Sequence, residues 1–378
     1  MMEVAEVFKK LDFNLCMQCA VCSGSCPLYM KSKLNPRKLM LEVAYLFYPL
    51  SINPPINIQQ KNEVWDCTTC SACSSRCPRD AKPLDVIIGL RSYLIESGLV
   101  PRTIVDVLDS IFKYGNPWGL SRNKRSEWAR DLKVKYASEK GDASTLYFVC
   151  CAASYDLRAQ NLAKATVKIL NSANVDFFIL GNEETCCGNE IYSLGEKGLF
   201  EELVNTNLEL FERYNVQEII TTSPHCFNAF KVRYGKNLDA RHYTTFFVYL
   251  IDSGKLKFSR KIEKVITYHD SCFLGKHNNI YEDPRKIIES IPGVKFVEMT
   301  RSKKKSICCE GGGGRMWHEV PGARLSEMRV KDALAVGAEI IATACPFCLM
   351  TIEDSIKTMG LEDKIMVKDI SELVAEAL

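Results

Sequence analysis

The sequence has no long hydrophobic run, no large excess of charge of either sign and no glycine motif for a nucleotide. Although 47% of its 378 residues are hydrophobic, no stretch approaches the ~18 consecutive apolar residues of a membrane-spanning helix. Its 49 basic and 46 acidic side chains leave a net charge of +3, which is too small to favour nucleic acid or an anionic membrane as a partner. The G-x-G-x-x-G and Walker patterns are absent, so we expect no flavin or nucleotide site in this chain.

The sequence also lacks the features of a secreted protein. Residues 1–12, MMEVAEVFKKLD, have neither the basic start nor the long apolar segment of a signal peptide, and we therefore expect a cytoplasmic location. Cysteine, in contrast, is abundant, with 18 residues. Most of them stand in closely spaced runs that cannot form an extended disulfide framework but suit metal binding.

The most specific pattern is a cysteine run that occurs twice. Residues 16–27 read CMQCAVCSGSCP and residues 67–78 read CTTCSACSSRCP, so both have the spacing C-x2-C-x2-C-x3-C-P. In such runs three cysteines bind one iron–sulfur cubane and the fourth binds the other. The spacing predicts two 4Fe–4S clusters, one on Cys16, Cys19, Cys22 and Cys77 and one on Cys67, Cys70, Cys73 and Cys26. The alternative, a pair of four-cysteine zinc sites, has no use for the third cysteine of each run.

The segment between the two runs favours a helical domain. Residues Pro36–Phe47 carry apolar side chains in a pattern typical of a helix, whereas a compact ferredoxin would have a shorter spacer of strands. The arrangement resembles the helical ferredoxin module of the iron–sulfur subunits of succinate and glycerol-3-phosphate dehydrogenases and of the C-type subunit of heterodisulfide reductase. The resemblance implies an all-α domain with two clusters over residues 1–99.

Residues 100–144 form a predicted connector without cysteine. An amphipathic helix is expected over residues 101–113, followed by a turn-rich segment at 115–119 and a basic stretch. Arg122, Lys124 and Arg125 could form a docking patch for an acidic partner. A solvated face beside two anchoring tryptophans is the interpretation that we favour.

Residues 145–258 and 259–378 form an internal repeat. Matched cysteines lie 121 or 122 residues apart: Cys151 and Cys272, Cys186 and Cys308, Cys187 and Cys309, Cys226 and Cys348. Each copy alternates strand-like runs, such as 145–150 and 264–269, with helical patterns such as 194–214 and 324–336. This alternation predicts two parallel α/β sheets, and the loops at the carboxyl edge of each sheet should bring its cysteines together.

The second copy has one cysteine more than a cubane needs. A cysteine, a Cys-Cys pair and a C-x-x-C pair follow one another, as in the B-type subunit of heterodisulfide reductase. The whole chain resembles the D-type subunit of that enzyme and the iron–sulfur subunits of glycolate, lactate and glycerol-3-phosphate dehydrogenases. That resemblance implies two α/β cysteine-rich domains of the CCG type and a noncubane 4Fe–4S cluster that cleaves a disulfide, with Cys272, Cys308, Cys309, Cys345 and Cys348 as ligands. A cubane with one bystander cysteine is the alternative.

Two further residues are candidates at this site. The family usually has glycine after the Cys-Cys pair, whereas this chain has Glu310 followed by glycines 311–314. The carboxylate could shift the cluster potential or accept a proton, or it could point to solvent, and the glycines predict backbone that passes close to the cluster. His269 and His225, each near a cysteine, could hydrogen-bond a cluster sulfur or carry a proton, or be ordinary polar residues near a loop.

The first copy has Ser223 where the second has Cys345. Its remaining candidates as ligands are Cys151, Cys186, Cys187 and Cys226, with Cys150 as a spare cysteine. Four thiolates could hold a further ordinary cluster. Alternatively, this copy has lost its metal and is a structural half.

The resemblance and the cysteine pattern together predict an iron–sulfur subunit of an oxidoreductase complex. Electrons would pass between the N-terminal cubanes and the C-terminal site, which reduces a disulfide. The alternatives are a pure relay from a flavin-dependent 2-hydroxyacid or glycerol-3-phosphate dehydrogenase to quinone, and a zinc-stabilised scaffold. Because no flavin motif is present, we expect a flavoprotein or a membrane cytochrome b-type subunit as partner, with peripheral association at the cytoplasmic membrane face through that partner.

Overall fold

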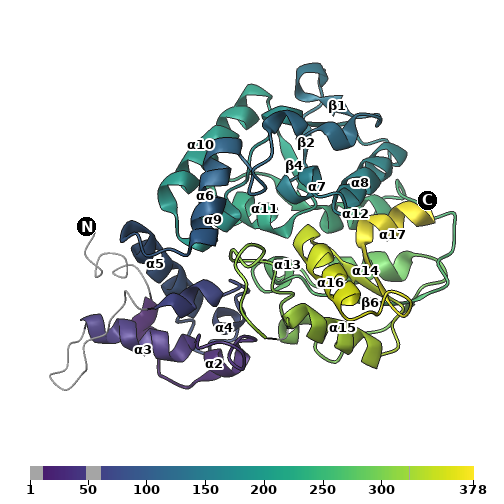
Figure 1. The fold of residues 1–378 in the computed structure, drawn as a ribbon. Coiled ribbons are helices and arrows are strands. Elements are labelled where there is room, and N and C mark those ends of the chain that lie inside the picture. Colours follow the sequence, from purple (N-terminus) through teal and green to yellow (C-terminus); the bar gives the residue numbers. More distant parts are fainter. Residues whose placement is uncertain (1–11, 48–60, 323) are drawn as a thin grey trace.

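Short helices surround the two cysteine runs in the N-terminal part of the chain, at the lower left of Figure 1. The structure, a computed structural model, describes residues 12–47, 61–322 and 324–378. The helices of this part are η1 (Asp12–Leu15), α2 (Val21–Ser25), α3 (Pro36–Phe47), η3 (Asn62–Asp66), α4 (Ala72–Ser75) and α5 (Pro83–Glu96). The next helix, α6 (Arg102–Tyr114), belongs to the predicted connector and lies against the first repeat (Figure 1). Within residues 12–47 and 61–134 every element is helical. The prediction of an all-α domain also covers residues 1–11 and 48–60, which lie outside the described residues. Residues 1–11 are also most of the segment to which the prediction about a signal peptide applies.

The two cysteine runs share an unusual backbone conformation. Gln18 and Ala20 in the first run, and Thr69 and Ser71 at the matching positions of the second, have φ angles between 51° and 66°. Residues other than glycine are strained in this left-handed region, and such strain persists only where the surrounding structure requires it. The same strain at the same positions shows that both runs are shaped in the same way around their cysteines.

A five-stranded parallel sheet carries the first repeat, at the top of Figure 1. Its strand order is β1-β3-β2-β4-β5, with β1 (Lys135–Tyr136), β2 (Thr145–Phe148), β3 (Phe177–Ile179), β4 (Glu218–Thr221) and β5 (Ala240–His242). The helices are α7 (Cys151–Tyr155), α8 (Gln160–Ser172), α9 (Asn189–Leu194), α10 (Lys197–Arg213), α11 (Pro224–Asn228) and α12 (Tyr243–Asp252). The central strands are almost wholly buried, as parallel strands covered on both faces must be. β1 lies within the predicted connector, which therefore adds an edge strand to this sheet.

A four-stranded parallel sheet carries the second repeat. The order β7-β6-β8-β9 comprises β6 (Val265–Tyr268), β7 (Lys295–Phe296), β8 (Ile340–Thr343) and β9 (Met366–Asp369). Its helices are α13 (Cys272–Gly275), α14 (Glu282–Ser290), α15 (Leu325–Ala335), α16 (Pro346–Thr358) and α17 (Ile370–Ala377). Pro224 in the first repeat and Pro346 in the second open the equivalent helices α11 and α16 at their first turn, where a missing N–H costs nothing.

The strands predicted from residues 145–150 and 264–269 are confirmed as β2 and β6, and the prediction of parallel sheets is confirmed in both repeats. The helical pattern at 194–214 is divided by Gly195, which has a φ of 90° and ends α9. A Cβ atom at this position would lie 2.5 Å from the backbone nitrogen of Ser92 in α5. The break therefore lets the N-terminal part approach the first repeat.

The two repeats face each other through their helices. α8 packs against α17, α12 against α14 and α11 against α13, so that one hydrophobic core runs through both sheets. A second core fills the N-terminal part and takes Cys272, Phe273, Cys308 and Leu325 from the second repeat. The N-terminal part is thus joined to the second repeat through a shared apolar interior. No helix among the described residues is both long and apolar enough to cross a bilayer.

Arg91 in α5 ties the N-terminal part to the first repeat. Its side chain is completely buried and donates hydrogen bonds to four backbone carbonyls. These belong to Val64, Trp65, Cys67 and Ser193, at 3.0, 3.3, 2.7 and 2.8 Å. Because Cys67 opens the second cysteine run and Ser193 lies in α9, one guanidinium orders both segments.

We predict that Arg91→Met destabilises the protein by about 3 kcal/mol or more, because it leaves buried carbonyl oxygens without their charged donor. Thermal unfolding of anaerobically purified protein measures the effect. Arg102→Met is the matched control: its side chain is 85% exposed in an i,i+4 pair with Asp106, so a change within ~0.5 kcal/mol is expected. Equal melting temperatures for the two variants would contradict the role of Arg91.

Candidate metal centres

The eight cysteines of the N-terminal runs line two small cavities. The first is lined by Cys16, Cys19, Cys22 and Cys77, and the second by Cys26, Cys67, Cys70 and Cys73. The fourth cysteine of each run therefore lies with the first three of the other run, in the arrangement that the spacing predicts. Their assignment as ligands stays a prediction.

Burial and neighbouring thiols raise the pKa of five of these cysteines, namely Cys22, Cys26, Cys67, Cys70 and Cys73. Burial raises the pKa of Cys73, and the neighbouring Cys67 and Cys70 raise it further. Burial also raises the pKa of Cys67 to about 11, partly opposed by the charge of Arg91. Backbone amides donate to two of the sulfurs, from Thr69 to Cys67 at 3.4 Å and from Ala81 to Cys77 at 3.3 Å. Thiols gathered in this way can lose their protons together only when cations join them, so each cavity fits an iron–sulfur cluster.

The five cysteines of the second repeat converge at the carboxyl edge of its sheet. Cys272 begins α13 after β6, Cys308 and Cys309 follow the short helix η9 (Lys303–Lys305), and Cys345 and Cys348 follow β8. Their side chains form a continuous series of contacts in the order Cys272, Cys308, Cys309, Cys348, Cys345. The Sγ atoms of Cys309 and Cys348 are 3.2 Å apart. Hydrogen bonds from Cys308 and Cys348 lower the pKa of the Cys309 thiol well below its ordinary value, against the effect of burial.

His269 aims an unpaired nitrogen at these sulfurs. Arg329 donates from Nε to Nδ1 of His269 at 3.2 Å, so the proton of the neutral ring is on Nε2. Burial and the charge of Arg329 lower the pKa of His269 well below its ordinary value, which keeps the ring neutral. Nε2 has no hydrogen-bond partner among the described residues, and the ligating atoms of His269, Cys309 and Cys348 lie within 4.8 Å of one another. A buried N–H donor without a partner fits a cluster sulfur as its acceptor.

His225 of the first repeat also reaches this site. Its Nδ1 lies 2.7 Å from Oε1 of Glu190, and its ring contacts Cys345 and packs on Phe273 with ring centroids 4.1 Å apart. Burial lowers the pKa of His225, but the charge of Glu190 and the contact with Cys345 outweigh it and raise the pKa to about 10. A buried cation therefore stands beside Cys345.

Glu310 does not point to solvent. Its carboxylate is 2.8 Å from Nζ of Lys31 in the N-terminal part and 2.7 Å from a guanidinium nitrogen of Arg315, and it accepts from the backbone amide of Leu325 at 2.8 Å. Burial raises its pKa, but these partners outweigh burial and lower the pKa below its ordinary value. Glu310 is therefore an ionised residue that connects two domains, and it is poorly suited to carry a proton near neutral pH.

The glycines after Glu310 pass directly against the second cysteine run. A Cβ atom on Gly313 would lie 2.5 Å from the carbonyl oxygen of Cys67, and one on Gly312 would lie 3.1 Å from that of Thr68. This close approach brings the thiol of Cys70 into contact with Cys308. A predicted ligand of the second cubane thus touches a predicted ligand of the five-cysteine site.

The predicted cysteines of the first repeat also lie together. Cys151 contacts Cys186, Cys186 contacts Cys187, and Cys187 contacts Cys226. The structure brings Cys150, which the sequence left as a spare, to the same group through a contact with Cys226. Hydrogen bonds from Cys186 and Cys226 lower the pKa of Cys187, as their counterparts do for Cys309.

Arg125 belongs to this first-repeat site and not to a solvated face. It is 2% exposed, pairs with Glu184 at 2.7 Å and donates to Sγ of Cys151 at 3.4 Å. The sequence interpretation missed it because Arg125 and Lys124 are adjacent in a basic stretch, and nothing in that stretch shows which side chain turns inward. Glu190 and Lys31 carry no distinguishing sequence pattern either.

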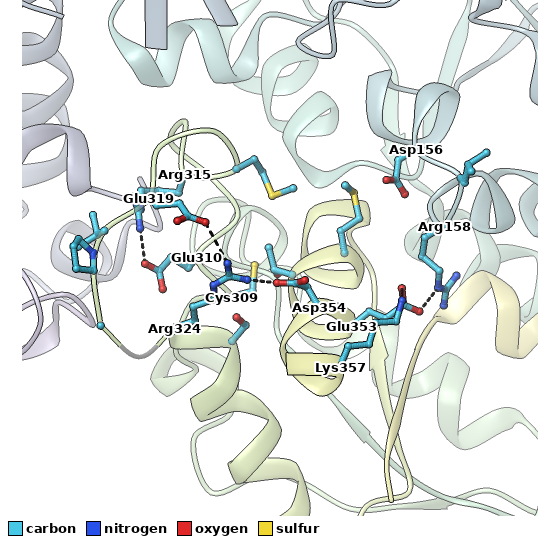
Figure 2. A pocket seen from close by; sticks show the side chains of 18 residues that line it. Asp156, Arg158, Cys309, Glu310, Arg315, Glu319, Arg324, Glu353, Asp354 and Lys357 are labelled. Carbon is cyan, nitrogen blue, oxygen red and sulfur yellow. Dashed lines mark hydrogen bonds and ion pairs between the residues drawn. The ribbon is translucent and has the colours of Figure 1, made fainter. Parts of the chain in front are cut away.

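A pocket of about 920 Å³ opens beside the five-cysteine site. Figure 2 shows Cys309, Glu310 and Arg315 on one side and Arg158 of the first repeat on the other. Arg158 pairs with Glu353 at 2.7 Å, and Arg324 pairs with Asp354. Cys309 is the predicted ligand that lines this pocket, so a molecule bound there would lie next to the site.

The helical part has two neighbouring cavities of four thiols each, and the second parallel sheet carries a site of five thiols. Together they are typical of an iron–sulfur protein. Sequence comparison agrees: a profile for a 4Fe-4S dicluster domain matches residues 15–82, and one for a cysteine-rich domain, CCG, matches residues 145–231 and 266–353. The D-type subunit of the Dihydromethanophenazine:CoB--CoM heterodisulfide reductase of Methanosarcina barkeri is 34% identical over 97% of this chain and 94% of its own length. The chain belongs to the family of that protein, which confirms the resemblance stated above.

Other relatives are longer proteins. The Probable iron-sulfur-binding oxidoreductase FadF of Bacillus subtilis is 38% identical over 87% of this chain, and the EtfAB:quinone oxidoreductase of Syntrophomonas wolfei is 31% identical over 97%. The matched regions span 49% and 58% of those two proteins.

We predict that Gly313→Ala loosens the contact between the second cysteine run and the second repeat, because its Cβ atom would meet the Cys67 carbonyl. Gly337→Ala is a matched control: its φ of 71° resembles the 67° of Gly313, but nothing lies within 4 Å of its Cβ position. Both variants carry a similar backbone strain of ~1 kcal/mol, and Gly313→Ala should lose about 2 kcal/mol more. Thermal unfolding measures the difference, and equal losses would contradict the contact.

Proposed function

We propose that this chain is the iron–sulfur electron-transfer subunit of an oxidoreductase complex, with electrons passing between a partner protein and the five-cysteine site of the second repeat. The observation that carries the proposal is the contact between Cys70 and Cys308. It joins the second four-cysteine cavity to the five-cysteine site without an intervening residue. An iron–sulfur cluster, when bound, supplies one-electron transfer.

The exposure of the cysteines gives this path an outer and an inner end. Cys19 is exposed, and Cys16 and Cys77 are partly exposed, so the first cavity lies near the surface where a partner can dock. Cys70 and Cys308 are 7% and 1% exposed, so the inner junction excludes water. The chain's own residues thus hold a conducting route that begins at the surface and ends beside a pocket.

The pocket at Cys309 supports chemistry at the inner end. Reduction of a disulfide takes two electrons and two protons and releases two thiols, and the route supplies the electrons singly. A disulfide substrate in this pocket would lie against Cys309, which is consistent with the name of the Methanosarcina barkeri relative. For the five-cysteine site we propose the noncubane 4Fe–4S cluster of the family, with cubanes in the two N-terminal cavities.

A pure electron relay is the second candidate. One of the longer relatives is named as a quinone oxidoreductase. In this candidate function the acceptor of the chain's complex is quinone, and the donor is a flavoprotein such as a 2-hydroxyacid or glycerol-3-phosphate dehydrogenase. A membrane cytochrome b-type subunit is the partner in the disulfide-reducing version. A cytochrome b-type partner, or quinone as the acceptor, would bring the chain to the cytoplasmic face of a membrane.

We predict that Cys309→Ser removes the electron paramagnetic resonance signal of the five-cysteine site and about four irons per chain, while the N-terminal cubane signals stay. Substrate-dependent turnover should be abolished, because the route then has no inner end. Iron and sulfide quantitation on anaerobically purified protein measures the loss. Wild-type spectra in this variant would contradict the assignment, and zinc without iron in the wild type would select the zinc-stabilised scaffold.

Purification of the native complex should separate the two candidate functions. A cytochrome b-type partner together with thiol–disulfide turnover is expected for a reductase. A co-purifying flavoprotein with quinone reduction and no disulfide turnover would establish the relay. A chain that is extracted gently from its native host without any redox partner would contradict the role in a complex.

A further inference from the structure

The first repeat contains five buried cysteines in one group, although its C-x-x-C pair is incomplete. We propose that Cys150, Cys151, Cys186, Cys187 and Cys226 together hold an iron–sulfur cluster, with Cys150 in the role that Cys345 has in the second repeat. The proposal goes beyond the proposed function, which uses the second repeat only.

The thiols of the two repeats touch in the same order. In the second repeat the series is Cys272, Cys308, Cys309, Cys348, Cys345. In the first it is Cys151, Cys186, Cys187, Cys226, Cys150. The first four positions correspond through the sequence repeat. The fifth does not, yet Cys150 occupies the same end of the series as Cys345.

The sheet register explains how Cys150 reaches this place. Phe148 pairs with Thr221 between β2 and β4, so Cys150 and Ser223 leave the sheet side by side two residues later. Tyr268 pairs with Ala342 between β6 and β8, so Ser271 and Cys345 leave it side by side three residues later. Each repeat thus has one cysteine and one serine at this adjacent pair of strand ends. In the first repeat the cysteine follows β2 and the serine follows β4, whereas in the second repeat the serine follows β6 and the cysteine follows β8.

Cys150 is held in its position at a conformational cost. Its φ of 74° and ψ of 161° fall in a region that is populated almost only by glycine, so a residue with a Cβ atom is strained there. Ser271, its counterpart, has ordinary extended angles of −62° and 131°. Glu184 fixes the strained turn by accepting from the backbone amides of Val149 and Cys150 at 2.9 and 3.1 Å. Such strain at one copy of a repeat points to a local function.

The surroundings complete a closed metal site. Arg125 holds Glu184 and donates to Cys151, so a buried cation stands beside the thiols, as His225 stands beside Cys345. The five cysteines are between 3% and 8% exposed, which admits electrons but no bulky substrate. His225 lies in the same helix turn as Cys226 and contacts Cys345, so it links this site to the second repeat.

The assignment also accounts for every cysteine of the chain. The eight of the N-terminal runs and the five of each repeat make up all 18. Loading of the site releases the thiol protons to solvent and takes up iron and sulfide. The first-repeat site then serves as a one-electron store beside the route from Cys70 to Cys309.

The test is iron and acid-labile sulfide quantitation with electron paramagnetic resonance on the anaerobically purified full-length chain. Cys150→Ser should lose about four irons and one signal, while the signals of the N-terminal cubanes and the one sensitive to Cys309→Ser remain. The double variant Cys150→Ser/Ser223→Cys restores the pattern of the second repeat and should recover the iron and the signal. Ser271→Ala, at the counterpart of Cys150, should change neither.

Wild-type iron content and spectra in Cys150→Ser would overturn the proposal, and so would zinc at this site. Loss of iron in Cys150→Ser without recovery in the double variant would also overturn it, because the equivalence of the two strand ends would be wrong. The remaining N-terminal signals report correct folding in each variant. Since Cys309→Ser tests the second repeat separately, the proposed function can stand or fall independently of this site.

Discussion

The close approach of Gly312 and Gly313 to the backbone of the second cysteine run is the contact that organises the remainder of the molecule. Cβ atoms at these two positions would lie 3.1 Å from the carbonyl oxygen of Thr68 and 2.5 Å from that of Cys67. Glycine, which has no Cβ atom, therefore permits this approach. Because of this approach, Cys70 touches Cys308 and the N-terminal core takes residues of the second repeat. Lys31 and Glu310 then close the same junction with a largely buried ion pair.

A buried cation accompanies each of the three inner cysteine groups. Arg91 lies near Cys67, Arg125 donates to Cys151, and protonated His225 contacts Cys345. Clusters held by thiolates carry negative charge, and in a dry interior that charge is stable only with a partner of opposite sign. Arg125 and His225 come from a different part of the chain than the thiols beside them, whereas Arg91 shares the N-terminal part with Cys67 and reaches the first repeat through the carbonyl of Ser193. The three residues therefore stabilise the sites and the packing between domains together.

The repeats show how one scaffold makes two sites of different character. Both gather five thiols at the carboxyl edge of a parallel sheet. The second has a pocket at its Cys-Cys pair, where Cys309 is reached between Glu310 and Arg158. The predicted connector, in contrast, packs over the first site: the carbonyl of Gly115 accepts from the amide of Cys186 at 2.9 Å. One site is thus open to a reactant, and the other is enclosed.

The amino-acid sequence was sufficient to predict the two cysteine runs, the repeat, the parallel sheets and the family, because regular spacing and strand–helix alternation are local patterns. It also indicated that His269 and the glycine run lie close to the second site. The folded chain was needed to show that Arg125 is buried, that Glu310 pairs with Lys31 and that Cys150 joins the first-repeat thiols. These contacts join residues distant along the chain, and they follow from sheet register and domain packing, which no short stretch of sequence contains.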